Sequence, residues 1–221
     1  MPPGGRFRRS EGCPTIREYM LLNLTSLFGV SVLAKDGNIG HVRDVLFHDR
    51  SWVVRYFVVE TGSWFSGRRV LLSPFIFLQP EWEKRVLPVD LTIEEVRQSP
   101  DVDTDLPVYR QQEIAMTRHY GWPAYWTMEA SQLPGEKSEP EGDPDLRSAN
   151  EILTYKVKTS DGDLGRMDDL VVEDANWFIR FLVLSTGSWF EGQKLLVATR
   201  WVGSVSWANK EVVVPHSRDA I

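Results

Sequence analysis

The sequence of 221 residues contains a single cysteine, Cys13, so no disulfide can form within the chain. Proteins of reducing compartments rarely use disulfides, and this composition favours the cytoplasm. No apolar run approaches the roughly 20 residues that a membrane-spanning helix needs. Residues 1–20 also lack the apolar core that is typical of a secretory signal peptide. We therefore expect a cytoplasmic protein that does not insert into a membrane.

Positive charge is also scarce. The 25 Lys and Arg residues are outnumbered by 31 Asp and Glu residues, which leaves a formal net charge of −6. Nucleic-acid-binding proteins carry clustered Lys and Arg, because contacts to phosphates supply much of the binding energy. The composition therefore disfavours a nucleic-acid partner. Apolar side chains are not scarce: hydrophobic residues make up 42% of the chain, which is enough to build packed cores.

Common catalytic and cofactor motifs are absent from the sequence. There is no hydrolytic triad or Walker loop, and Gly37-x-x-Gly40 is too short for a dinucleotide fingerprint. Asp161-x-Asp163 resembles the start of a calcium loop, but Val172 stands where that loop needs a glutamate. The four histidines lack metal-ligand spacing: His41, His48, His119 and His216. We predict no catalytic, cofactor-binding or metal-binding residue, and no enzyme activity.

One pattern occurs twice in the chain, at an offset of 125 residues. Residues 36–96 align without a gap on residues 161–221, with 17 identities in 61 positions. Each copy contains an Asp-Gly pair, then a Trp-x-x-Arg segment, then the sequence Thr-Gly-Ser-Trp-Phe. An internal repeat of this length predicts two related structural units.

Short apolar runs between turn residues are typical of an all-β fold. The Asp-Gly pairs at 36–37 and 161–162 predict hairpins, because these residues tolerate the backbone of a tight turn. Second hairpins are expected at 49–50 and 174–175. The strands at 52–60 and 177–185 are apolar on both faces, which predicts that both faces are covered. The predicted strands are 31–35, 40–47, 52–60, 69–72 and 85–89, then 156–160, 165–172, 178–185, 194–197 and 211–214.

The second hairpin of each copy can be given a register. If partner residue numbers sum to 99, Asp44 lies opposite Arg55, and the same arithmetic puts Asp169 opposite Arg180. Opposite charges that face each other across two strands stabilise a sheet by about 0.2–1 kcal/mol. A catalytic pair is one interpretation of these residues. We favour structural ion pairs inside the sheets.

Composition divides the chain into five segments. Residues 1–19, rich in Pro and Gly around Cys13, are predicted to be a disordered tail. Residues 20–98 form the first β unit and residues 148–221 the second. Between them lie a helical arm at 99–128 and an acidic Pro/Gly linker at 129–147, whose composition cannot build a core. Thr92-Ile-Glu-Glu95 is a capping box and predicts a short helix at the end of the first unit.

The repeated residues resemble a known family. Asp-Gly-x-Ile/Leu-Gly, an Asp four residues later and Trp-x-x-Arg are similar to the PRC-barrel domain. That domain occurs in the cytoplasmic part of the photosynthetic reaction centre H subunit and in a ribosome maturation factor. The doubled pattern, with its Tyr-Gly-x-Pro-x-Tyr-Trp segment at 120–126, resembles stand-alone bacterial proteins with two PRC-barrels. The resemblance implies a mainly β fold of two small six-stranded PRC-type barrels, with a short helical arm after the first. It also implies roles in scaffolding and assembly, and it supplies no catalytic residues.

The two Thr-Gly-Ser-Trp-Phe segments are the best candidates for a site. They put four aromatic side chains in loops between strands: Trp64, Phe65, Trp189 and Phe190. Aromatic residues are enriched where proteins meet, so these four are the candidate interface. The alternative is that each Trp folds back over its own barrel, because Trp usually buries most of its area.

The sequence thus predicts a non-enzymatic protein–protein interaction or assembly module. The expected partner is an unidentified protein, with a homodimer as one form of the association. The alternative function is association with RNA or the ribosome through a barrel face, by analogy with the maturation factor. The acidic composition argues against this alternative.

Overall fold

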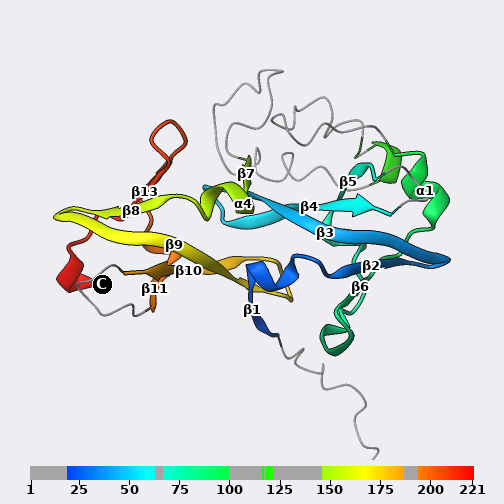
Figure 1. The fold of residues 1–221 in the computed structure, drawn as a ribbon, viewed down its shortest axis with the longest axis horizontal. Coiled ribbons are helices and arrows are strands. Elements are labelled where there is room, and N and C mark those ends of the chain that lie inside the picture. The colour runs from blue at the N-terminus through cyan, green and yellow to red at the C-terminus, as the bar shows by residue number, and fades with distance from the viewer. Residues whose placement is uncertain (1–18, 63–66, 100–115, 117, 122–145, 187–193) are drawn as a thin grey trace, which may run out of the picture.

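The structure is a computed structural model, and it describes residues 19–62, 67–99, 116, 118–121, 146–186 and 194–221. Within these residues the protein is mainly β, as the sequence predicts. Two sheets lie toward opposite ends of the long axis, and short segments from both halves of the chain meet between them (Figure 1). None of the helices in this part of the chain has the length and apolar character that crossing a membrane requires.

The first sheet has the strand order β5-β4-β3-β2-β6. All neighbours are antiparallel except β2 and β6, which are parallel. The helix after this sheet begins at the predicted capping box: the Thr92 side chain accepts from the Glu95 backbone, and Glu95 accepts in return from the Thr92 backbone. The elements are β2 (Ser31–Ala34), β3 (Gly37–His48), β4 (Val53–Thr61), β5 (Arg69–Leu72), β6 (Val86–Pro88) and α1 (Ile93–Arg97).

The second sheet has the order β11-β10-β9-β8-β13-β12, with β8 and β13 as its parallel pair. Its strands are β8 (Lys156–Thr159), β9 (Gly162–Glu173), β10 (Ile179–Ser185), β11 (Lys194–Ala198), β12 (Ser204–Ser206) and β13 (Glu211–Val213). The ten predicted strands are all present in the two sheets. The other helices whose full bounds lie in the described residues are α4 (Ala149–Ile152) and the 3-10 helices η1 (Leu24–Leu27), η3 (Pro74–Ile76), η4 (Trp82–Lys84), η6 (Thr199–Trp201) and η7 (Arg218–Ala220). Residues 116 and 118–120 are also helical.

Both sheets are open in the part of the chain that the structure describes. The two strands that end each path, β5 and β6 or β11 and β12, are not paired with each other. The mainly β class is therefore confirmed, whereas the closed six-stranded barrels are not observed among these residues.

The predicted hairpin register is wrong. Asp44 lies across from Val58, and Asp169 lies across from Val183, so neither aspartate faces an arginine. The register shifts between Val42 and Asp44 and again between Leu46 and Phe47. These irregularities change which residues face each other, and a calculation that assumes an uninterrupted ladder cannot include them.

The Asp-Gly turns are confirmed, and the structure gives a reason for their aspartates. Asp36 Oδ1 accepts a hydrogen bond of 2.8 Å from the backbone N–H of Ile93, at the start of α1. Asp161 Oδ1 accepts one of 3.1 Å from Arg218, at the start of η7. Each aspartate thus ties its hairpin to the segment that follows its sheet, and the two contacts are 125 residues apart.

Gly40 lies where β3 approaches β4 too closely for any side chain. A Cβ atom at this position would be 1.9 Å from the carbonyl oxygen of Glu60. We expect Gly40→Ala to lower the free energy of unfolding by about 2–3 kcal/mol, because the strands must separate. Urea denaturation measures the loss. The control is Gly29→Ala, where φ is +76° but no atom lies within 4 Å of the added carbon. Equal midpoints for the two variants would contradict the prediction.

Candidate functional site at the junction of the two halves

The two halves of the chain exchange short strands. β1 (Leu21–Asn23) comes from the first half but pairs with β9 of the second sheet. β7 (Leu146–Ser148) precedes the second sheet but pairs with β3 of the first. The residue numbers of β1 and β7 differ by 125, and so do those of their partners on β3 and β9. The exchange is therefore reciprocal, and both strands lie near the middle of the molecule (Figure 1).

The centre of this junction is a bridge between Val53 and Phe178, which are themselves 125 residues apart. Around it the backbone hydrogen bonds are symmetric. The Val54 N–H donates to the Trp177 carbonyl at 3.0 Å, and the Ile179 N–H donates to the Trp52 carbonyl at 2.7 Å. Trp52 and Trp177 both have left-handed backbones, with φ of 55° and 61°. That conformation is uncommon for a bulky residue, so its occurrence at both positions marks the junction as a constrained site.

The repeated aspartates hold the exchanged segments. Asp169 is buried, and its Oδ1 accepts hydrogen bonds from the backbone N–H groups of Thr25 at 3.0 Å and Leu170 at 2.7 Å. Its Oδ2 accepts a further bond from the Thr25 hydroxyl. In the other half, Asp44 accepts from the Ser148 hydroxyl at 2.6 Å and from the Asn150 N–H at 3.1 Å. Each aspartate therefore binds the segment that crosses over from the other half.

These contacts contradict the predicted pairing of Asp44 with Arg55 and of Asp169 with Arg180. Arg180 binds Glu173 instead, with 2.7 Å between Arg180 Nε and Glu173 Oε2. Arg55 Nη2 lies 3.4 Å from the Ser51 hydroxyl. The register irregularities explain the difference, because they put Asp44 and Asp169 across from valines instead of arginines.

One side of the junction is filled with aromatic rings. Trp177 is buried and packs edge-on against Phe57 and Phe77 of the first half, with centroid distances of 4.9 Å and 5.9 Å. Beside it, Asp174 accepts a hydrogen bond of 3.0 Å from Trp82 Nε1 and one of 2.8 Å from the Met20 N–H. This side of the junction is therefore closed by side chains from both halves.

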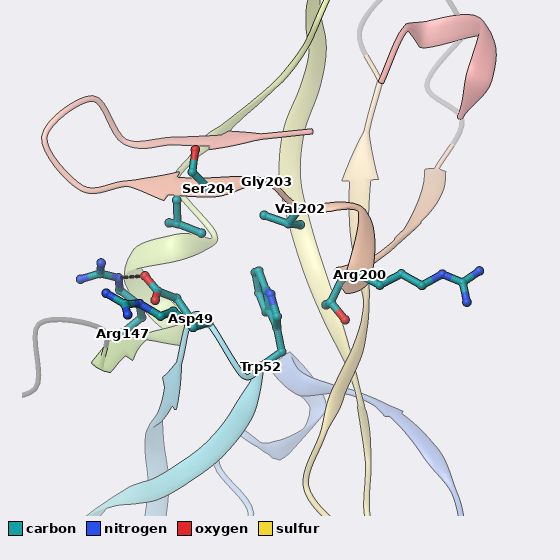
Figure 2. A pocket seen from close by; sticks show the side chains of 10 residues that line it. Asp49, Trp52, Arg147, Arg200, Val202, Gly203 and Ser204 are labelled. Carbon is teal, nitrogen blue, oxygen red and sulfur yellow. Dashed lines mark hydrogen bonds and ion pairs between the residues drawn. The ribbon is translucent and has the colours of Figure 1, made fainter. Parts of the chain in front are cut away.

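The equivalent side around Trp52 is a pocket of about 480 Å³. In Figure 2 the Trp52 ring stands between an ion pair, Arg147 with Asp49, and the segment that carries Val202. The Arg147 and Asp49 side chains are only 12% and 7% exposed. The ten lining residues come from the hairpin turn of the first sheet, from β7, and from η6 through β12: Asp49, Arg50, Trp52, Arg147, Thr199, Arg200, Val202, Gly203, Ser204 and Val205.

A comparison of the sequence with protein-family models gives one match, in the first half of the chain. Residues 21–92 match the PRC-barrel domain. No curated protein matches the chain. The match begins at the first residue of β1 and ends before α1. The PRC-barrel segment therefore includes both the exchanged strand β1 and the hairpin that carries Asp44, Asp49 and Trp52.

The four candidate interface aromatics, Trp64, Phe65, Trp189 and Phe190, lie outside the described residues. They stay a prediction. The sequence does not predict that Asp44, Asp49 and Trp52 lie together at a junction between the halves. The same three residues recur at 169, 174 and 177, in one hairpin of each half. This recurrence is the sequence feature that could have indicated the junction.

Two phenols, of the buried Tyr155 and the partly buried Tyr120, have raised pKa values. Tyr155 is 1% exposed, and burial together with its 3.0 Å hydrogen bond to Glu151 raises its pKa above the usual range. Burial also raises the pKa of Tyr120 to about 12. Both groups therefore keep their protons at neutral pH and serve as hydrogen-bonding and packing groups.

Proposed function

We propose that this chain is a non-enzymatic protein–protein interaction or assembly module built from two PRC-barrel units, residues 20–98 and 148–221. The family match to residues 21–92 supports the first unit. The second is supported by contacts that recur 125 residues later, at the Asp-Gly turns, the central aspartates and the exchanged strands. A pair of such units offers a composite surface that neither has alone.

The observation that carries the proposal is a set of three exposed apolar side chains on segments that meet beside Trp177. Met20, Phe75 and Leu78 expose 49%, 66% and 50% of their area. They belong to segments that meet at Asp174 and Trp177: Met20 and Trp82 bind Asp174, and Phe77, between Phe75 and Leu78, packs on Trp177. Clustered exposed apolar side chains usually mark a contact surface, because water disfavours them. Phenylalanine and methionine are also enriched in protein interfaces relative to the rest of the surface.

The residues that are exposed beside Trp177 differ from those at the equivalent positions in the second half of the chain. The positions that match Phe75 and Leu78 are Arg200 and Gly203. If these apolar side chains were required only for the β fold, both sides would need them. Their restriction to one side therefore favours a contact with another protein over a role in folding.

The test is the double variant Phe75→Glu/Leu78→Glu in the full chain. We expect it to weaken self-association, or the capture of a protein partner, at least about tenfold, because two charges must then be desolvated. Sedimentation analysis of the purified chain and quantitative affinity capture measure the two forms of association.

The control is Leu196→Glu on β11, because Leu196 is 57% exposed and lies in the second sheet, away from Trp177. It should behave as the unchanged chain does. The proposal is wrong if the chain is monomeric and captures no protein, or if the double variant and the control are affected equally. Salt-sensitive binding to structured RNA in a gel shift would favour the RNA-associated alternative instead.

A further inference from the structure

The exchanged strand β1 is an edge strand in the part of the chain that the structure describes. It pairs with β9 through Leu21, Leu22 and Asn23, and no other described strand lies along its second edge. Three consecutive large apolar side chains where the strand begins are exposed: Tyr19 at 60%, Met20 at 49% and Leu21 at 50%. An exposed apolar edge of this kind favours pairing with a strand from another chain.

The pairing of β1 with β9 determines which backbone groups point outward. The Asp174 N–H donates to the Met20 carbonyl at 3.1 Å, so the backbone groups of Met20 face β9. In an antiparallel pair, residues that exchange hydrogen bonds alternate with residues that do not. The N–H and C=O groups of Leu21 and Asn23 therefore point away from β9. In agreement, the Asn23 carbonyl accepts from the Ser26 hydroxyl and not from β9. Leu21 thus offers one donor and one acceptor to a further strand.

The sequences that lead into the two exchanged strands differ in a way that bears on such pairing. The residues 125 positions after Tyr19 and Met20 are Pro144 and Asp145, directly before β7. A proline has no N–H to donate, and charged side chains oppose the addition of a strand, so natural proteins use both to protect sheet edges. Residues 19–23 read Tyr-Met-Leu-Leu-Asn and contain neither. Of two strands that are equivalent in the fold, only β1 therefore lacks these protecting residues.

We propose that β1 pairs with β1 of a second copy of this chain, antiparallel and about a two-fold axis at Leu21. The Leu21 N–H of each copy then donates to the Leu21 carbonyl of the other, and Tyr19 lies opposite Asn23. A second copy fits this edge because residues 19–23 are uncharged, so no like charges meet across the axis. Such a two-fold contact closes as a dimer. The inference rests on the proposed function, since it names a second copy as the protein partner.

The two-fold axis provides the test, because the side chain at position 21 must face its own copy. Leu21→Lys and Leu21→Glu each put like charges opposite each other, so each variant alone should dimerise at least about tenfold more weakly. An equimolar mixture of the two variants should recover the dimer, because lysine then faces glutamate. Sedimentation velocity of the full chain measures the association. Leu21 is 50% exposed and its backbone does not bond to β9, so the fold should persist, which circular dichroism checks.

The matched control is Leu33 on β2, which is 40% exposed. Leu33→Lys and Leu33→Glu, alone or mixed, should dimerise as the unchanged chain does. The pairing of β1 is overturned if the mixture of Leu21 variants sediments as each variant does alone, or if neither variant weakens the dimer. It is also overturned, while the proposed function stands, if the chain is a monomer that captures another protein, or if only Phe75→Glu/Leu78→Glu breaks the dimer. A monomer that captures no protein overturns both.

Discussion

Trp177→Ala should lower the free energy of unfolding by about 3–5 kcal/mol, which is the usual cost of truncating a buried tryptophan. Trp177 is 8% exposed, and its ring packs against Phe57 and Phe77 in the other half of the chain. Alanine keeps the backbone carbonyl that accepts from Val54, so the effect isolates the lost ring contacts. Chemical denaturation followed by far-ultraviolet circular dichroism measures the change.

The matched control is the next residue in the chain. Phe178 is 37% exposed, and Phe178→Ala should cost about 1–2 kcal/mol, because its ring buries less apolar area than that of Trp177. Losses of equal size at positions 177 and 178 would show that the aromatic cluster does not hold the halves together.

Asp169→Ala is expected to destabilise the protein by about 3–4 kcal/mol. Asp169 is 5% exposed and accepts three hydrogen bonds, two of them from Thr25 in the exchanged segment. Removing the carboxylate leaves these donors without their acceptor, and each unsatisfied buried donor costs about 1–3 kcal/mol. Because the contact joins η1 to β9, hydrogen exchange should also increase at Thr25 and Leu170.

The control for Asp169 is its neighbour on the same strand. Asp168 forms an exposed ion pair with Lys194, with 2.8 Å between Oδ2 and Nζ, and its side chain is 33% exposed. Asp168→Ala should change stability by less than about 1 kcal/mol, as is usual for surface pairs. If both alanine variants unfold at the same denaturant concentration, Asp169 does not act as an anchor for the exchanged segment.

The strands could be predicted from the sequence, because their limits are set locally. Asp-Gly and Asp-Arg pairs mark the turns, and the apolar runs between them match the observed strands closely. The register could not be predicted, because it depends on two irregularities in the pairing of β3 with β4, one at Arg43 and one at Arg55, which no short sequence pattern indicates. The partners chosen for Asp44 and Asp169 were wrong for this reason.

The junction between the two halves could not be predicted from short sequence patterns. β1 and β7 are three residues long, too short to show an alternating pattern, and Leu146 and Arg147 of β7 fall in the segment expected to be a linker. The sequence did indicate that the apolar strands at 52–60 and 177–185 need covering. In the structure the halves contact each other where these strands begin, at Val53 and Phe178. The pocket beside Trp52 could not be predicted either, because its lining residues come from both halves of the chain.

The reciprocal exchange of β1 and β7 has a consequence for how the chain folds. The contact between Met20 and Asp174 joins residues that are 154 positions apart, and the Ser148 contact to Asp44 spans 104 positions. Contacts of such long range form late, because the entropy of closing the loop must be overcome first. Each sheet also lacks one of its strands until the other half has arrived. The two halves should therefore not unfold as independent domains, but as one cooperative unit with a single transition.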